Sequence, residues 1–384
     1  MYWYDEIMNL DFESSSLCNA SCAICNRRYA GGSKVENLVE TYVTLEQFKE
    51  WFPVEFIKNL VRMSMCGNYG DSMTNPELLD ILRYARSLNT NLIITMNTNA
   101  SGRTPEFWTE LSEIIGTAGH LTFSVDGLKD TNWIYRKGTH WDKIMMAMEN
   151  YKKGPGSSRW EFLVFKHNQH QVEEARQLSK DIGIDSFHAK EAFGFNEDAM
   201  SGEHRSYFVV FGENDKHLYD IEAKTDVQFD HSKFLSNYKN LNKKLGDGFV
   251  RQSFTTDNGP LNEWEKKLGR TCIDCLVVKP KSIFVSSEGL VFPCCMTAGK
   301  LYAPDTDDSI QLKKFIADIG KDKINLNHNT LKDIIDGDVF QVSWPDNWKD
   351  NNILNKRLRV CSMFCGKETN NNWKNVQESM ATEN

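Results

Sequence analysis

The sequence lacks the features that attach a protein to a membrane or export it. No run of 18 or more apolar residues occurs, so no segment is expected to span a bilayer. The first residues, MYWYDEIMNLDFE, contain neither a basic stretch nor an apolar core, so a signal peptide is not expected. We therefore expect a cytoplasmic protein with no membrane partner.

Positive charge is also scarce. The 384 residues include 45 Lys and Arg against 53 Asp and Glu, which gives a formal net charge of -8. The basic residues form no stripe, and a surface with this balance repels phosphate backbones. Nucleic acid is therefore a disfavoured partner, and an RNA-modifying activity is disfavoured with it.

Cysteine, in contrast, is abundant and clustered. Nine of the ten cysteines fall into tight groups, and only Cys66 stands alone, on a segment that is expected to be a buried strand. The groups are Cys18/Cys22/Cys25, Cys272/Cys275, Cys294/Cys295 and Cys361/Cys365. Disulfide scaffolds are typical of short secreted chains, whereas tight groups in a long chain of a reducing compartment favour metal binding. Cys66 is interpreted as an ordinary core cysteine.

The first half of the chain alternates short β-like runs with helical ones. Strands are expected at Met8–Phe12, Val61–Met65, Leu92–Met96, Leu121–Val125, Trp160–Phe165 and Ser186–Ala189. Helices are expected at Leu45–Trp51, Pro76–Leu88, Pro105–Ile115, Trp141–Lys152 and Gln171–Ile182. Six βα repeats predict an α/β fold, a parallel sheet that is open or curled into a partial barrel. The functional loops of such a sheet follow the carboxyl ends of its strands.

The first cysteine group lies directly after the first expected strand. In LDFESSSLCNASCAICNRR, Cys18, Cys22 and Cys25 follow the spacing C-x3-C-x2-C. A structural zinc site takes four ligands, usually from two segments. Three thiolates on one short loop can hold three corners of a [4Fe–4S] cubane and leave the fourth iron open. A zinc loop, or three thiols without a ligand, is the alternative.

This motif resembles the radical S-adenosylmethionine (SAM) superfamily. The resemblance implies a partial (β/α)6 TIM-like barrel and a cluster whose fourth iron is chelated by SAM. An electron from the reduced cluster would cleave SAM to methionine and a 5′-deoxyadenosyl radical, which abstracts hydrogen from a substrate. Ile24 departs from the family, which usually has an aromatic residue before the third cysteine.

Loops after the next three strands extend the resemblance, and it implies SAM-contacting residues in them. Gly70 and Asp71, in MCGNYGDS, match the glycine–acid pair that receives the SAM amino group. Asn99, in TMNTNASG, and Ser124, in FSVDGL, match two further elements. Arg136, in WIYRKG, is expected to pair with a carboxylate of SAM or of the substrate.

For some of these residues, an interpretation without a functional role is the alternative. Asp71 replaces the usual glutamate, and Ser72 stands where proline is usual. Arg136 can equally be an exposed basic residue. His167 and His170 lack further ligands nearby in sequence and are expected to be solvated.

A hairpin carries the next cysteines. SIFVSSEGLVFPCC predicts two strands that turn at Ser287–Gly289, and Cys275, Gly289 and Cys294 follow the spacing C-x13-G-x4-C. This spacing resembles the SPASM or twitch extension of radical SAM enzymes, and the small number of downstream cysteines resembles the shorter twitch type. The resemblance implies a second [4Fe–4S] cluster.

Four cysteines are assigned to this second cluster. Adjacent residues of a strand point to opposite faces, so Cys294 and Cys295 are not expected to share it. The assigned ligands are Cys275, Cys294, Cys361 and Cys365, with Cys272 as a rival for the first position. A four-cysteine zinc site is the competing interpretation.

The expected organisation has four parts. They are a radical SAM core at 5–195, a polar insertion or linker at 196–270, an α+β twitch-like domain at 271–366 and a polar tail at 367–384.

The resemblance implies an enzyme, an oxidoreductase or a peptide-modifying type, that abstracts hydrogen from a peptide or a small carbohydrate. Its partners would be SAM, that substrate and a reductant such as flavodoxin or ferredoxin. The alternative is a non-catalytic iron–sulfur or zinc scaffold.

Overall fold

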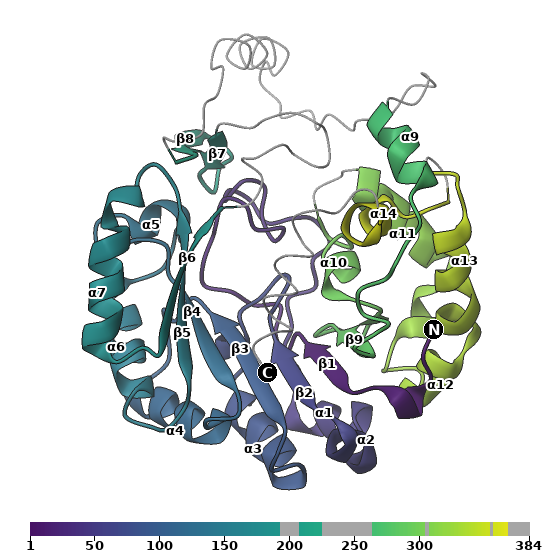
Figure 1. Ribbon diagram of the computed structural model, residues 1–384, viewed down its shortest axis with the longest axis horizontal. Helices are drawn as coiled ribbons and strands as arrows, with labels where there is room; N and C mark the ends of the chain where they lie inside the picture. The colour runs from purple at the N-terminus through teal and green to yellow at the C-terminus, as the bar shows by residue number, and fades with distance from the viewer. Residues whose placement is uncertain (193–206, 225–262, 304–306, 354–355, 368–384) are drawn as a thin grey trace.

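The computed structural model describes residues 1–192, 207–224, 263–303, 307–353 and 356–367, and most of them surround one sheet (Figure 1). Its eight strands lie in the order β10-β9-β1-β2-β3-β4-β5-β6, parallel except for the β9–β10 pair. They are β1 (Asn9–Phe12), β2 (Arg62–Met65), β3 (Ile93–Thr98), β4 (His120–Ser124), β5 (Ser158–Val164), β6 (Ser186–Glu191), β9 (Ser282–Val285) and β10 (Val291–Phe292). The sheet is not closed, and the six sequential parallel strands confirm the predicted α/β fold of partial-barrel type.

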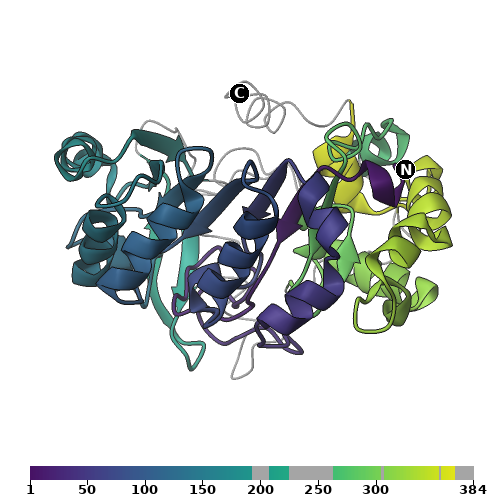
Figure 2. The ribbon, with the colours of Figure 1, turned by 90° about the horizontal axis from the view of Figure 1, so that it is seen from below.

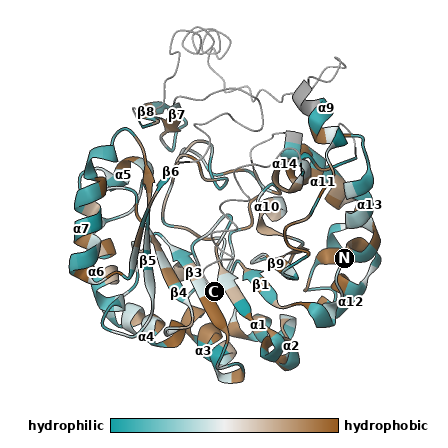
Figure 3. Ribbon diagram, viewed as in Figure 1, coloured by the Kyte–Doolittle hydropathy of each residue, from teal (hydrophilic) through white to brown (hydrophobic). Residues whose placement is uncertain are grey.

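Helices cover the outer face of this curved sheet (Figures 1 and 2). They are α1 (Leu45–Trp51), α2 (Val54–Asn59), α3 (Leu78–Leu88), α4 (Pro105–Ile115), α5 (Asn132–Tyr135), α6 (Trp141–Tyr151) and α7 (Val172–Ile182). The alternation of apolar and polar residues in the strands explains the layering. Leu10 and Phe12 are fully buried, and Phe12 contacts Phe48 and Phe52, whereas Asp11 between them faces the concave side. Figure 3 shows the helices hydrophilic on their outer sides.

Several helices begin or end at the capping residues from which the sequence predicts their ends. Thr44 and Gln47 form a capping box at the start of α1, and Thr104 caps α4. Gly183, with φ of 88°, ends α7 in the left-handed conformation that glycine favours. Helix α3 begins at Leu78, later than predicted, because the Asn75 side chain bonds to Ser14, Val43 and Glu77 and holds this segment as a loop.

A β-hairpin emerges from the stretch expected to be a polar insertion. It consists of β7 (Tyr207–Phe211) and β8 (His217–Glu222), and α9 (Glu263–Arg270) ends the same stretch. Val210 and Ile221 of the hairpin are buried in a small hydrophobic cluster with Cys22 and Ala23. The hairpin therefore covers the first cysteine loop. Residues 196–206 and 225–262 of that prediction lie outside the described residues.

The C-terminal region continues the same sheet. β9 pairs in parallel with β1, and Gly289, with φ of 83°, turns the predicted hairpin into β10. The helices that follow are α10 (Cys295–Ala298), α11 (Asp307–Ile319), α12 (Leu331–Asp336), α13 (Trp344–Lys349) and α14 (Arg359–Cys365), with a π-helix at Val339–Ser343. Single 3-10 turns occupy Tyr4–Glu6, Ser72–Thr74, Gln169–Gln171 and Lys321–Ile324. Within the described ranges, no helix has both the length and the apolarity needed to cross a bilayer.

Candidate cysteine sites

The first cysteine loop leaves the carboxyl end of β1 and is fixed to the barrel by a buried arginine. The Arg27 guanidinium is 2% exposed, donates to the Ser16 and Tyr69 carbonyl oxygens and pairs with Glu40. Such a buried guanidinium, whose two Nη groups bond to carbonyl oxygens and one carboxylate, orders the loop before any ligand enters.

Hydrogen-bond donors face the sulfur atoms of this loop. The Ala20 backbone N–H lies 3.4 Å and the Asn99 amide nitrogen 3.7 Å from Cys18 Sγ. The Arg136 Nη1 lies 3.9 Å from Cys22 Sγ. Burial raises the pKa of Cys18 to about 12 and that of Cys22 to about 11, so the thiols hold their protons unless a metal replaces them. Three thiols with donors directed at them fit a sulfur-bound group of negative charge.

Asp71 is already engaged by the protein's own donors. Its Oδ2 accepts from the Asn99 backbone N–H at 2.8 Å and from the Thr98 hydroxyl at 3.1 Å, and its Oδ1 accepts from the Met73 N–H at 3.1 Å. Asp71 thus ties the loop after β2 to the end of β3. Gly70 packs so closely that a Cβ would overlap the Ser15 carbonyl oxygen, so a side chain cannot be accommodated there.

Arg136 is neither exposed nor free. Its Nε donates to Asp126 Oδ2 at 2.5 Å, and Asp126 is fully buried. The interpretation of Arg136 as an exposed basic residue is therefore wrong. Ser124, at the end of β4, pairs in register with Glu161 of β5 on the concave side.

Glu13 is a site-shaping residue that sequence reasoning missed. It is 2% exposed, and its Oε1 accepts from the backbone N–H groups of Tyr69 and Gly70 at 2.6 and 3.2 Å. Burial raises the pKa of Glu13 to about 7 against the lowering effect of these backbone donors. The sequence did carry a sign of this role, because Glu13, in FESSS, directly follows a predicted strand.

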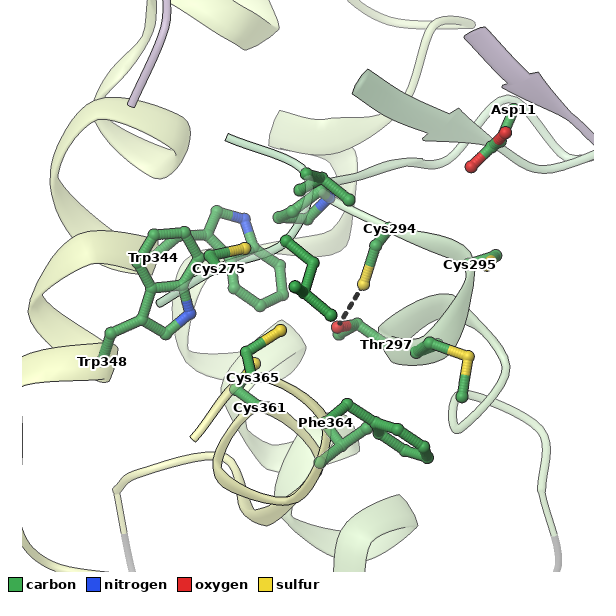
Figure 4. A pocket seen from close by; sticks show the side chains of 15 residues that line it. Asp11, Cys275, Cys294, Cys295, Thr297, Trp344, Trp348, Cys361, Phe364 and Cys365 are labelled. Carbon is green, nitrogen blue, oxygen red and sulfur yellow. Dashed lines mark hydrogen bonds between the residues drawn. The ribbon is translucent and has the colours of Figure 1, made fainter. Parts of the chain in front are cut away.

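The four assigned C-terminal cysteines line one cavity of about 80 Å³ (Figure 4). Cys275 precedes β9, Cys294 follows β10, and Cys361 and Cys365 lie on α14, with their sulfur atoms gathered around the same space. A single water requires only ~10–15 Å³, so the space admits a group of several atoms. Cys275 and Cys365 are in hydrogen-bond contact, which raises the pKa of the Cys275 thiol.

The remaining cysteines stand apart from this arrangement. Cys295 borders the cavity, but its side chain points away from the other sulfur atoms in Figure 4. Strand alternation is not the reason, because Cys294 is the N-cap and Cys295 the first residue of helix α10. Cys272 is exposed and does not line the cavity. Cys66 is exposed on the concave side, 3.6 Å from the Asn97 amide nitrogen, so its interpretation as a core cysteine is wrong.

Neutral donors surround the cavity. The Thr297 hydroxyl lies 3.3 Å from Cys294 Sγ, and the indole nitrogens of Trp344 and Trp348 are buried without a hydrogen-bond partner. Among the described residues, no three His, Cys, Asp or Glu side chains converge as a single metal ion requires. Four thiols spread around a roomy cavity, with spare N–H donors in its wall, fit a polynuclear group that carries its own sulfur acceptors.

The concave face of the sheet is polar, a feature that sequence reasoning also missed. Asp11 lies beside Ser64 in register, and Lys190 Nζ lies 2.6 Å from Glu161. The other polar members of this face are Arg62, Thr95, Asn97, Thr122, Ser124, Arg159 and His188. The strand alternation was the available signal, because the positions opposite the buried apolar residues are polar.

His167 is not solvated as expected. Its ring stacks on Phe165 with centroids 5.2 Å apart, and both ring nitrogens are buried without a partner. Burial lowers the pKa of His167 to about 4, so the ring is neutral at pH 7. His170 is exposed as expected.

Direct hydrogen bonds join the two cysteine regions. The Asn26 amide, next to Cys25, donates to the Gly299 carbonyl oxygen at 3.1 Å. The Asn68 amide donates to the Cys295 carbonyl oxygen at 2.9 Å. The cavity-lining segment at α10 therefore contacts both the first cysteine loop and the loop after β2.

Comparison with solved structures establishes the fold. Native anSMEcpe with bound AdoMet superimposes with a TM-score of 0.50 at 14% identity, covering 98% of each chain. SuiB of Streptococcus suis bound to S-adenosylmethionine gives 0.45 at 14% identity, covering 76% of this chain and 61% of SuiB. BtrN in complex with AdoMet and 2-DOIA gives 0.38 at 12% identity, covering 91% and 92%.

The chain thus spans about six tenths of the length of SuiB. No protein-family model and no curated protein matches the sequence. The likeness to anSMEcpe shows a shared fold over nearly the whole of both chains.

Proposed function

We propose that this chain is a radical SAM enzyme with a second iron–sulfur cluster. Cys18, Cys22 and Cys25 would hold a [4Fe–4S] cluster with one open iron, and the four cavity cysteines would hold the auxiliary cluster. When bound, the first cluster and SAM supply a 5′-deoxyadenosyl radical that removes a hydrogen atom from the substrate. The observation that carries the proposal is the loop of three thiols, one buried and two half-buried, faced by donors at the carboxyl end of β1.

The chain's own residues orient and shield this site. Arg136, held by Asp126, offsets negative charge beside Cys22. The hairpin β7–β8 covers the loop with apolar side chains and helps to shield Cys22 from water. The SAM bound by anSMEcpe supports the same ligand here, since the two chains share their fold.

The concave face supports a polar substrate. A substrate near the first loop would meet a wall that carries Asp11, Glu161 and Lys190. An apolar ligand would displace water from these charged groups without replacing its hydrogen bonds, which is costly. A peptide or a small carbohydrate satisfies this requirement, and a lipid does not. We favour a peptide, because SPASM and twitch enzymes often mature peptides, which is an argument from fold alone.

The test uses protein purified and reconstituted without oxygen. Iron and sulfide are counted, dithionite and SAM are added, and 5′-deoxyadenosine is measured by chromatography. About eight irons per chain together with 5′-deoxyadenosine support the proposal. The Cys18/Cys22/Cys25→Ala protein is the matched control and should retain about four irons without SAM cleavage. Tightly held zinc in place of iron would contradict the proposal.

One observation favours the second candidate, an iron–sulfur protein without turnover. The Asp71 carboxylate accepts from Asn99, Thr98 and Met73 instead of facing an open position. If iron is present but SAM neither binds nor is cleaved, the chain is a scaffold of this kind.

A further inference from the structure

The tryptophans of the auxiliary cavity reach it through an irregular helix. Helix α13 continues directly from the π-helix Val339–Ser343, which ends where the backbone N–H of Trp344 donates to the Val339 carbonyl oxygen. Pro345 explains the irregularity, since it has no N–H and its ring would clash with the Gln341 carbonyl oxygen in a regular α-helix. Trp344 and Trp348, four residues apart, then lie on one face of α13.

Both indoles line the cavity that the four cysteines surround (Figure 4). Trp344 is fully buried and also packs on Phe315, with ring centroids 4.7 Å apart. Trp348 lies beside the Cys361 thiol. Both side chains thus form part of the wall itself.

The Trp344 indole N–H has no acceptor within the protein, and the Trp348 indole N–H faces only the Cys361 thiol. Both N–H groups are buried and neither meets an oxygen or nitrogen acceptor, whereas Trp108 and Trp160 donate to carbonyl oxygens at 3.0 and 2.8 Å. Buried Trp N–H groups normally find a partner. The acceptor for Trp344 must therefore enter the cavity with a ligand, and Trp348 faces a cysteine sulfur that is a weak acceptor until a metal makes it a thiolate.

The chemistry of the cavity identifies that acceptor. The four cysteines offer thiolates to a metal, and a single ion held by them adds no acceptor atoms of its own. A [4Fe–4S] cluster brings inorganic sulfide and makes the thiolates anionic, and sulfur of both kinds accepts N–H donors. The space of about 80 Å³ between the thiols suits such a group.

We infer that Trp344 and Trp348 donate their indole N–H groups to sulfur atoms of the auxiliary cluster and raise its reduction potential. This inference rests on the proposed function. Hydrogen bonds to cluster sulfur stabilise the reduced form, which carries one more negative charge. The two tryptophans are positioning residues, since they act on the cluster and not on the substrate.

The experiment isolates the auxiliary cluster in the full chain. The Cys18/Cys22/Cys25→Ala protein is reconstituted without oxygen, its iron is counted, and its cluster is titrated potentiometrically with detection by electron paramagnetic resonance. Trp344→Phe and Trp348→Phe keep an aromatic ring but remove the donor. Phe364→Leu is the matched control, because it alters the wall of the same cavity without removing a donor.

Each Trp→Phe substitution should shift the potential to lower values, the double variant furthest, with iron near four per chain and Phe364→Leu unshifted. An unchanged potential in the iron-replete double variant overturns the donor role and leaves the cluster assignment intact. A parent protein that binds no iron overturns the auxiliary cluster itself. Should Trp344→Phe not fold, the less buried Trp348 carries the same test alone.

Discussion

The two cysteine regions differ in what faces their sulfur atoms. The N-terminal loop offers three thiols from one segment, faced by a guanidinium, an amide and a backbone N–H. The C-terminal cavity gathers four thiols from three segments, faced by a hydroxyl and two indoles that carry no charge. Three ligands leave a position for exchange, whereas four close the coordination of a permanent group. Under the proposed function, the three-thiol loop is the reacting site and the four-thiol cavity holds a permanent group.

Removing one thiol from the N-terminal loop gives the largest expected effect. Cys22→Ala should reduce 5′-deoxyadenosine formation to background, because two thiols cannot hold the cluster, while about four irons remain in the cavity. Iron analysis and chromatography measure both quantities. Cys66→Ala is the control and should retain full iron and SAM cleavage, because Cys66 belongs to neither group. Full activity in Cys22→Ala would contradict the assignment of SAM cleavage to the N-terminal loop.

The charge beside the N-terminal loop is tested next. Arg136→Met leaves the buried Asp126 without its partner and should lower the free energy of unfolding by ~3–5 kcal/mol. Urea unfolding measures this change. Lys129→Met breaks the exposed pair with Asp142 and should cost ~0–1 kcal/mol. Equal losses in the two variants would show that burial of the Arg136 pair does not matter.

The pH dependence of stability tests the contact between Glu13 and the loop after β2, which links the two cysteine regions. Its carboxyl keeps a proton up to about pH 7 in the folded protein but only to about 4.5 in the unfolded chain. The folded state therefore binds more protons between these values, and the free energy of unfolding should fall as pH rises through this window, by up to ~3 kcal/mol.

Glu13→Gln removes this titration and keeps an oxygen for the Tyr69 and Gly70 N–H groups. The variant should be more stable than the parent at pH 8, with the difference vanishing near pH 4. Chemical unfolding of both proteins across this range measures it. Parallel pH profiles would mean that the carboxyl titrates normally.

Asp71 gives the smallest expected effect. Asp71→Ala releases the Asn99 and Thr98 donors and should weaken SAM binding about tenfold, equivalent to ~1.4 kcal/mol. Equilibrium binding of SAM to the reconstituted protein measures the affinity. An unchanged affinity would make Asp71 a brace between two strand ends and remove it from the SAM site.

The sequence predicts the regular parts of the barrel well, because they depend on local signals. Helices α1 and α4 have the predicted bounds, and all six strands appear within a few residues of their predicted positions. Hydrophobic periodicity, caps and Gly183 act over a few residues and are readable directly.

What the sequence does not reveal depends on distant contacts. Glu13 and Asp71 look alike as acidic residues after strands, yet only tertiary structure shows that backbone N–H groups occupy both. The hairpin β7–β8 lies in a polar stretch, and the apolar residues that anchor it pack on a loop almost 190 residues earlier. The indoles of Trp344 and Trp348 acquire a role only because α13 folds against the four cysteines.

The position of β1 has a consequence for the order in which the chain assembles. β1 lies between β2 and β9, so one edge of the first strand pairs with Ser282–Val285, far later in the chain. A nascent chain shorter than this exposes a row of unpaired backbone groups, which invites pairing with other chains. Pairing across so long a separation is also slow. Ribosomal synthesis thus leaves the barrel open to aggregation until its last quarter emerges, and a C-terminal truncation would damage the first strand.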